Sequence, residues 1–214
     1  MTALSARLLS VIAPPFCWGC GAETRAGSPL CGGCLAALRW LPAEQVVLAG
    51  VATWAPLAYE GPAAALARAL KYRGAVALAE PMAARMAANA PDGVLRRDAA
   101  LVPVPLHPAR RRRRGYNQAA LLAAALAGRT QLRCEDCLRR TGSRSRQVGR
   151  SRAERIAGIA GRIEVDRGFA PPSRAVLVDD VATTGATLAA CAGALRDAGA
   201  SEVGAVTFAR TPGR

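Results

Sequence analysis

The stretch V-L-V-D-D-V-A-T-T-G-A-T, residues 176–187, carries the strongest structural signal in this chain of 214 residues. It starts with a short apolar run, typical of a buried β-strand, that ends at Asp179 and Asp180. A Thr/Gly turn follows, and a helical pattern then extends from Leu188 to Asp197 and stops before Gly199. The stretch therefore predicts a strand, a tight turn and a helix in direct succession.

The residue types at this turn indicate a sugar phosphate as ligand. Backbone N–H groups at the start of a helix have no intrahelical acceptor, so they attract anions. Asp179 and Asp180 would repel a phosphate, but carboxylates accept hydrogen bonds from neutral hydroxyl groups. Residues 176–187 therefore predict a site for a ribose 5-phosphate. The plainer alternative is an ordinary strand-to-helix turn with threonine caps.

The remainder of the chain alternates between strand and helix patterns. Helices are expected over 64–72, 80–89, 117–127 and 151–160, and strands within 46–59, 100–104, 162–165 and 202–208. Such alternation predicts an α/β fold with a mainly parallel sheet flanked by helices. Ligands of open parallel sheets bind beyond the carboxyl ends of the strands, where the two aspartates are expected.

The N-terminal part of the chain is expected to form a separate cysteine knuckle. Two C-x-x-C pairs stand ten residues apart, and they comprise Cys17, Cys20, Cys31 and Cys34. This spacing favours a tetrahedral zinc site, with redox-active dithiols or a metal-free cysteine hairpin as the alternatives. We therefore divide the chain into residues 1–42, a short N-terminal helix followed by the knuckle, and residues 43–214. A zinc site in turn indicates a reducing, cytoplasmic compartment.

The other cysteines do not suggest a second metal site. Cys134 and Cys137 form a third C-x-x-C pair, but no partner pair lies near them in the sequence. Free thiols are the favoured interpretation. Cys191 fits the apolar side of the helix after residue 187 and is expected to pack in the core.

Together, these motifs resemble the ComF family, in which a type I phosphoribosyltransferase-like domain follows a cysteine knuckle. The D-D-V-A-T-T-G-A-T segment resembles the loop that binds phosphoribosyl pyrophosphate (PRPP) in that fold. The resemblance implies that Asp179 and Asp180 hold the ribose hydroxyls. It also implies that the following residues bind the 5-phosphate: Ala182, Thr183, Thr184, Gly185, Ala186 and Thr187.

A second segment resembles the family around the pyrophosphate end of PRPP. The V-P-V-P-L-H-P stretch, residues 102–108, leads into a run of arginines and then R-G-Y-N-Q, residues 114–118. The resemblance implies a pyrophosphate loop at Val104 and Pro105, with Arg114 near the departing group. Guanidinium groups stabilise the charge that grows on pyrophosphate as its bond to C1 breaks. The alternative for Arg111–Arg113 is a solvated loop or a nucleic-acid-binding patch.

Lys71 is the only lysine of the chain and lies in L-K-Y-R-G, residues 70–74, which also matches a family pattern. Its ammonium group is a mobile point charge that suits a phosphate. An exposed lysine at a helix end is an equal alternative. His107 has no partner that would make it a base, so we expect it to be a turn residue.

Positive charge is concentrated in the middle of the chain. The formal net charge is +14, and residues 96–155 contain sixteen arginines against four acidic residues. Such a field favours polyanions, including PRPP, pyrophosphate and nucleic acid. The preference for Arg over Lys fits a compositional bias, but that bias does not explain the clustering.

Two functions follow from these features. The first is a Mg²⁺-dependent phosphoribosyltransferase that transfers the phosphoribosyl group of PRPP to an unidentified acceptor. The second is a non-enzymatic single-stranded DNA-binding protein of DNA uptake, which acts with the competence machinery and has regulatory or vestigial PRPP binding. A zinc-dependent regulator that senses PRPP is a third, weaker reading. Residues 156–163 depart from the family pattern in the part expected to face the acceptor. No apolar run has membrane-spanning length.

Overall fold

The computed structural model describes residues 15–141 and 162–213. The expected N-terminal helix, the expected helix over 151–160 and the departure from the family pattern at 156–161 lie outside these residues. None of the helices in the described residues combines the length and the hydrophobicity that a bilayer crossing needs.

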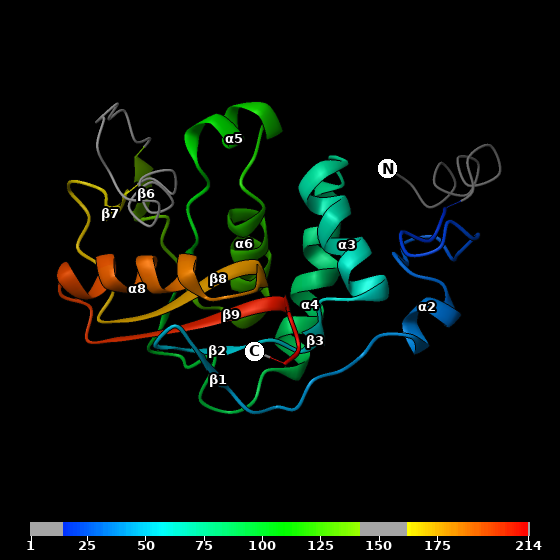
Figure 1. Cartoon of the computed structure of the whole chain (residues 1–214), viewed down its shortest axis with the longest axis horizontal. Helices are drawn as coiled ribbons and strands as arrows, with labels where there is room; N and C mark the ends of the chain where they lie inside the picture. Colours follow the sequence, from blue (N-terminus) through cyan, green and yellow to red (C-terminus); the bar gives the residue numbers. More distant parts are fainter. Residues whose placement is uncertain (1–14, 142–161, 214) are drawn as a thin grey trace.

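A seven-stranded sheet forms the centre of the molecule (Figure 1). Its strand order is β1-β2-β9-β8-β4-β5, and β3 pairs with the end of β9. All pairings are parallel except that of β1 with β2. The predicted α/β class with a mainly parallel sheet is therefore confirmed. The strands are β1 (Val46–Leu48), β2 (Val51–Trp54), β3 (Leu57–Ala58), β4 (Ala100–Pro103), β5 (Arg133–Cys134), β8 (Arg174–Ala182) and β9 (Glu202–Arg210).

Helices cover both faces of this sheet, as expected for parallel strands. On one face, α3 (Gly61–Tyr72), η1 (Val76–Leu78), α4 (Ala79–Asn89) and α6 (Gln118–Thr130) share a buried apolar cluster with the sheet. The other face packs against α8 (Ala186–Asp197) and a two-stranded antiparallel sheet of β6 (Leu138–Thr141) and β7 (Arg162–Val165). Val176 and Val178 of β8 belong to the first cluster and Leu177 to the second, so successive residues of β8 face opposite layers.

The cysteine segment and α2 (Gly32–Ala36) lie at the end of the molecule opposite α8 and β7 (Figure 1). This segment is not isolated from the core, because Cys17, Leu30 and Cys34 belong to the same buried cluster as α3 and α4. Backbone hydrogen bonds also join Leu41 to Pro56 and Ala58 to Arg39. The division of the chain after residue 42 stays a prediction.

Several element boundaries differ by a few residues from those expected from the sequence, and one helix was not expected. Helix α3 begins at Gly61 and not at residue 64, because Pro62 in the first turn suits a helix start. Helix α6 continues past Gly128 to Thr130, and Gln131 ends it with a left-handed backbone (φ 60°). The arginine run, for which a solvated loop was one interpretation, forms α5 (Pro108–Arg114).

Local capping explains the helical arginine run. Pro108 occupies the first turn of α5, and the Nδ1 atom of His107 accepts a hydrogen bond from the backbone N–H of Ala109 at 3.2 Å. Gly115 ends the helix with a φ of 85°. His107 is thus a helix cap, in line with its expected place in a turn.

Candidate functional site

The two aspartates lie in the second half of β8, which continues to Ala182. The strand is flanked by β9 on one side and β4 on the other. Beyond β4, the backbone N–H of Val104 still donates to the carbonyl of Val178 at 3.0 Å. The turn at Val104 and Pro105 therefore begins directly beside Asp179 and Asp180.

Asp180 is buried, with 1% of its surface exposed. Its Oδ2 atom lies 2.9 Å from the ammonium nitrogen of Lys71 on α3. Its Oδ1 atom has no hydrogen-bond partner among the described residues. Lys71 thus covers one oxygen of a carboxylate whose other oxygen has spare capacity to accept a hydrogen bond.

Asp179 is only partly covered and has a different environment. Its Oδ1 atom accepts the backbone N–H of Asp180 at 2.8 Å. Burial and the adjacent Asp180 carboxylate raise the pKa of Asp179 well above its usual range, although Lys71 opposes this effect. The two carboxylates are therefore not equivalent, since only Asp180 has a direct ion pair.

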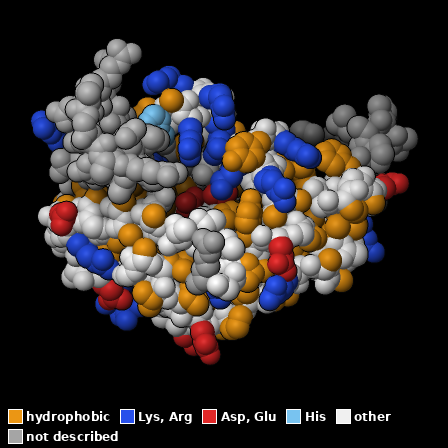
Figure 2. Space-filling view, viewed as in Figure 1, with side chains coloured by type: hydrophobic (Ala, Val, Ile, Leu, Met, Phe, Trp, Pro, Cys, Tyr) orange, Lys and Arg blue, Asp and Glu red, His pale blue; other side chains and the backbone are white. Residues whose placement is uncertain are grey.

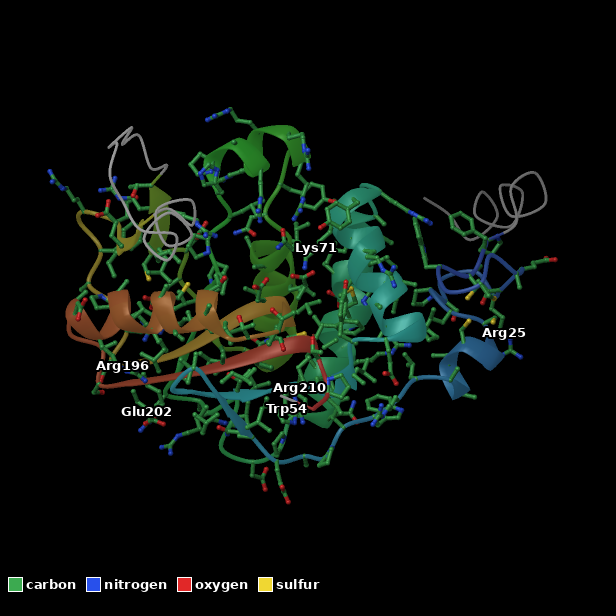
Figure 3. The ribbon with its side chains drawn as sticks, in the orientation of Figure 1. Arg25, Trp54, Lys71, Arg196, Glu202 and Arg210 are labelled. Atoms are coloured by element: carbon green, nitrogen blue, oxygen red, sulfur yellow. The ribbon has the colours of Figure 1, made fainter. Side chains whose placement is uncertain are left out.

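The ammonium group of Lys71 is held by these acids. Its partial burial alone would lower the pKa of Lys71, but the Asp180 carboxylate, with Asp179 as a weaker neighbour, raises it overall. The side chain keeps 21% of its surface exposed. Figure 3 shows Lys71 in the space between α3 and α6. Of the two expectations for Lys71, an exposed lysine at a helix end does not describe this contact.

The turn after β8 lies close to the hairpin formed by β1 and β2. Gly185 has a φ of 78°, and a Cβ atom built there would lie 2.6 Å from the Cβ atom of Leu48. Only glycine fits this position, because the backbone is left-handed and Leu48 fills the side-chain space. Thr183, Thr184 and Ala186 are exposed, and Thr187 is half-buried.

Helix α8 starts directly after this glycine. The backbone N–H of Ala186 lies 3.4 Å from the hydroxyl oxygen of Thr184. The other first-turn amides of α8 have no intrahelical acceptor and point toward the turn. Ala182 differs from the rest of the predicted loop, because its side chain is buried and its carbonyl accepts the backbone N–H of Thr211 at 3.0 Å.

Arg114 does not contact the aspartates in this structure. Its Nη1 atom donates to the side-chain carbonyl of Gln118, which is buried. Its guanidinium carbon lies 5.4 Å from the centre of the Tyr72 ring, within the range of a cation–π contact. Arg114 therefore lies beside the end of α3, next to the residue that follows Lys71.

The R-G-Y-N-Q segment also fixes α3 and α6 through two further contacts. The hydroxyl of Tyr116 donates to the carbonyl of Leu70. The side chain of Asn117 donates to the carbonyl of Val104 at 3.0 Å and accepts the N–H of Ala119 at 3.1 Å, which caps α6. This segment thus connects the turn after β4 with the end of α3 that carries Lys71.

Arginines 110–113 are exposed on α5, and no ion pair among the described residues involves them. Figure 2 shows basic side chains above a hollow, with acidic side chains at its bottom near the end of β8. Arg110 lies close enough to Arg140 of β6 to lower the pKa of Arg140, in addition to the effect of burial. Positive charge therefore borders the site on the side of α5.

The four N-terminal cysteines come together as the spacing predicts. Their sulfur atoms all lie within 4.8 Å of one another, and those of Cys20 and Cys31 are 3.7 Å apart. Tetrahedral zinc with Zn–S bonds of about 2.3 Å needs sulfur atoms roughly 3.8 Å apart, so the arrangement fits this metal. Glycine at position 19 leaves space for this sulfur, because a Cβ atom there would lie 2.8 Å from the sulfur of Cys34.

The cysteine thiols differ in acidity. Burial raises the pKa of Cys17, but hydrogen bonds from the backbone of Cys31, Cys20 and Gly19 outweigh it and lower the pKa to about 6. Burial and the neighbouring sulfur atoms raise the pKa of Cys34 to about 12. A divalent cation would remove the repulsion that keeps such closely spaced thiols from ionising together.

Cys134 and Cys137 lie apart from this cluster, on either side of the connection between β5 and β6. Cys134 is exposed and Cys137 is buried, and burial raises the pKa of both thiols. Both are free thiols, as is Cys191, which packs in the core of the α8 side.

Sequence reasoning missed three contributors to this site. Leu48 precedes the tight turn of the first hairpin, and only the fold brings it to Gly185. Gln118 was quoted within R-G-Y-N-Q, but its buried contact with Arg114 was not expected. The hydrogen bond from Tyr116 to Leu70 joins two motifs that both stood out in the sequence. The only signal in the sequence was that L-K-Y-R-G and R-G-Y-N-Q occur in the same chain.

Comparisons with known proteins agree with the motif resemblance. The chain is 29% identical over 197 residues to Competence protein F of Haemophilus influenzae (strain ATCC 51907 / DSM 11121 / KW20 / Rd). The alignment covers 88% of this chain and 82% of that protein. The predicted resemblance to the ComF family is therefore confirmed. No protein-family model matches the chain.

Two solved structures also match part of the chain. Glutamine phosphoribosylpyrophosphate (PRPP) amidotransferase from B. subtilis, complexed with ADP and GMP, has a TM-score of 0.40 at 24% identity and covers 60% of this chain. The structure of the allosteric regulatory enzyme of purine biosynthesis has a TM-score of 0.39 at 22% identity and also covers 60%. The matches span only 26% and 25% of those two chains.

Proposed function

We propose that this ComF-like chain binds PRPP at the carboxyl end of β8 and transfers its phosphoribosyl group to an acceptor, with release of pyrophosphate. The observation that carries the proposal is the position of three parts directly beside the turn after β4. They are the aspartate pair, the tight turn at Gly185 and the start of α8. These parts offer separate positions for a sugar, a phosphate monoester and a second anionic group.

The 5-phosphate would bind at residues 183–187. The first-turn amides of α8 are available donors, and Thr183 and Thr184 present exposed hydroxyls beside them. Gly185 lets the backbone turn tightly where Leu48 packs closely against it. This position attracts a dianion without any charged side chain in the turn itself.

The ribose hydroxyls would donate to Asp179 and Asp180. The unpartnered Oδ1 atom of Asp180 supports this role, because a buried carboxylate oxygen without a hydrogen bond carries a free-energy cost that a ligand hydroxyl removes. The raised pKa of Asp179 also supports this role. It shows that the ionised carboxylate is unfavourable in the site, and hydroxyl donors would stabilise that ionised form.

The pyrophosphate would lie along the turn at Val104 and Pro105, near Lys71 and Arg114. Mg²⁺ bound with PRPP would supply charge neutralisation at the pyrophosphate oxygens. In the transfer step, the C1–O bond to pyrophosphate breaks and a bond from C1 to an acceptor nitrogen or oxygen forms. The pyrophosphate leaves with the electron pair of the broken bond, and positioned cations stabilise its charge.

None of the described side chains around the aspartate pair is suited to act as a general base for the acceptor. His107, the only histidine, uses its Nδ1 atom to cap α5. We therefore expect an acceptor that brings its own nucleophilic nitrogen or oxygen.

Calorimetric titration with PRPP and Mg²⁺ tests the proposal, with the wild type compared with the double variant Asp179→Asn/Asp180→Asn. Loss of two charge-assisted hydrogen bonds should weaken binding by about a hundredfold or more. Asp92→Asn is the matched control, because Asp92 is exposed and lies before β4, away from the site. Unaltered PRPP affinity in the double variant would overturn the assignment. Pyrophosphate release in the presence of mixed acceptors then separates transfer from binding alone.

The cysteine cluster is proposed to bind one structural zinc ion. Its support is the fit of the sulfur spacing to tetrahedral zinc and the burial of Cys17 and Cys34 in the core shared with α3 and α4. Metal analysis should give one zinc per chain, and its removal should lower the free energy of unfolding. A chain that is fully folded and free of metal would contradict this role.

Single-stranded DNA binding is a second candidate function, and the name of Competence protein F suggests it. The observation that favours it is the exposed row of arginines on α5. If these residues bind phosphates, the affinity for an oligonucleotide should fall steeply with salt, and Arg112→Ala/Arg113→Ala should reduce the slope by about two. A salt slope that the double variant leaves unchanged would exclude α5 as the binding face.

A further inference from the structure

The ion pair between Lys71 and Asp180 obstructs the proposed ribose position. Asp180 is 1% exposed, and both of its carboxylate oxygens are buried, with the ammonium group of Lys71 against Oδ2. A hydroxyl and an ammonium group compete for the same carboxylate lone pairs. Sugar binding through Asp180 therefore requires a movement that uncovers it.

The side chain of Lys71 is the part that is free to move. Its backbone is fixed, because Leu70 is fully buried and its carbonyl accepts the hydroxyl of Tyr116. The ring of the next residue, Tyr72, contacts the guanidinium group of Arg114. The lysine stem, by contrast, has four rotatable bonds and retains 21% exposure.

The same contacts bring Lys71 next to the proposed pyrophosphate position. Arg114 and Tyr116 belong to the segment that follows α5, and Asn117 ties this segment to the carbonyl of Val104. The ammonium group of Lys71 could therefore reach an anion along the turn after β4 by rotation of its side chain. The ammonium group can exchange a carboxylate partner for a pyrophosphate oxygen.

We propose that Lys71 makes the site selective for a sugar that carries a pyrophosphate over the corresponding sugar monophosphate. A ribose 5-phosphate must separate Lys71 from Asp180 and gives the ammonium group no new partner. A pyrophosphorylated sugar separates the same pair but supplies a second anion for the lysine. The inference deepens the proposed function and rests on it, because it assumes that the sugar binds at Asp179 and Asp180.

Two other roles of Lys71 make different predictions. A lysine that only strengthens the fold would affect all ligands alike. If Lys71 only contacts the pyrophosphate group, its removal would weaken the binding of pyrophosphate and PRPP. The binding of ribose 5-phosphate would then be unaffected. Only a competing lysine predicts that its removal makes ribose 5-phosphate bind more tightly.

The experiment is a calorimetric titration of wild type and Lys71→Met with ribose 5-phosphate, pyrophosphate and PRPP, each in the presence of Mg²⁺. We expect ribose 5-phosphate to bind about tenfold more tightly to Lys71→Met, and PRPP about tenfold less tightly, since each change removes or frees one charge-assisted contact. The preference for PRPP would thus fall by about a hundredfold. Arg68→Gln, on the exposed side of α3, is the matched control and should leave the preference unchanged.

Lys71→Gln covers the case in which Lys71→Met does not fold, because its amide can still donate to Asp180. It should shift both affinities in the same directions by smaller factors. Ribose 5-phosphate affinity that stays the same or falls in both variants would overturn the inference, even if PRPP still binds to the wild type. A wild type that binds neither sugar would instead overturn the proposed function, and the inference with it.

Discussion

The hydroxyl of Tyr116 donates a hydrogen bond to the backbone carbonyl of Leu70, the residue that precedes Lys71. This bond joins the segment after α5 to the end of α3, which are 46 residues apart in the chain. Lys71 lies in the last turn of α3, which this bond holds against the segment after α5. The position of the ammonium group in the site therefore depends on a residue that does not itself face the aspartates.

Tyr116→Phe should remove this bond while it keeps the ring. The carbonyl of Leu70 then loses its side-chain donor, so the free energy of unfolding should fall by about 1 kcal/mol. Urea unfolding measures this change. Tyr72→Phe is the control, because the Tyr72 ring is 67% exposed and its contact with Arg114 needs no hydroxyl. Equal losses in the two variants would contradict the special role of Tyr116.

Gly185→Ala should impair both folding and phosphate binding. The new methyl group would meet Leu48 at 2.6 Å on a backbone with φ of 78°. A cost of about 2 kcal/mol or more is expected from the combined clash and strain. Gly193→Ala, in the middle of α8 with open space around it, should instead stabilise the protein by up to about 1 kcal/mol. Thermal unfolding and ribose 5-phosphate titration of both variants check this contrast, and similar results for the two would contradict it.

Gly19→Ala should weaken zinc binding, because its Cβ atom would press on the sulfur of Cys34 at 2.8 Å. Competition with a chelator should give a zinc affinity at least about tenfold lower, which corresponds to about 1.4 kcal/mol. Gly33→Ala adds a methyl group next to the same cysteine but into open space. It should retain the affinity of the wild type. Equal zinc affinities for the two variants would argue against the metal geometry.

Asp179→Asn should stabilise the protein at neutral pH. The pKa of Asp179 is raised in the folded state, so its ionised form costs stability above the unfolded pKa of about 3.9. This cost disappears as the pH falls below that value, because the carboxyl group is then protonated in both states. Denaturant unfolding should show a gain for Asp179→Asn at pH 7 that shrinks toward pH 4. A gain independent of pH would contradict the assigned cause.

Much of the fold and part of the site followed from local patterns. The apolar run before Asp179, the turn at Gly185 and the helical pattern after it predicted β8, its turn and α8, because each depends on near neighbours in the chain. The spacing of the N-terminal cysteines likewise brings their sulfur atoms together. The alternation of strand and helix patterns was sufficient to predict the mainly parallel sheet.

The features that could not be predicted depend on contacts between distant segments. Lys71 and Asp180 are 109 positions apart, and nothing in either motif indicates that they pair. The contact between Leu48 and Gly185 also joins segments that are far apart in the chain. Helix α5 was missed for a different reason, since five successive arginines suggest a solvated loop until the cap at His107 and the stop at Gly115 are known.

The measurement that tests the account most directly is a crystal structure of the protein grown with PRPP and Mg²⁺. We predict the 5-phosphate at residues 183–187, the ribose hydroxyls within hydrogen-bond distance of Asp179 and Asp180, and the ammonium group of Lys71 turned from Asp180 to the pyrophosphate. Ligand bound elsewhere, with the turn after β8 unoccupied and Lys71 still on Asp180, would contradict it.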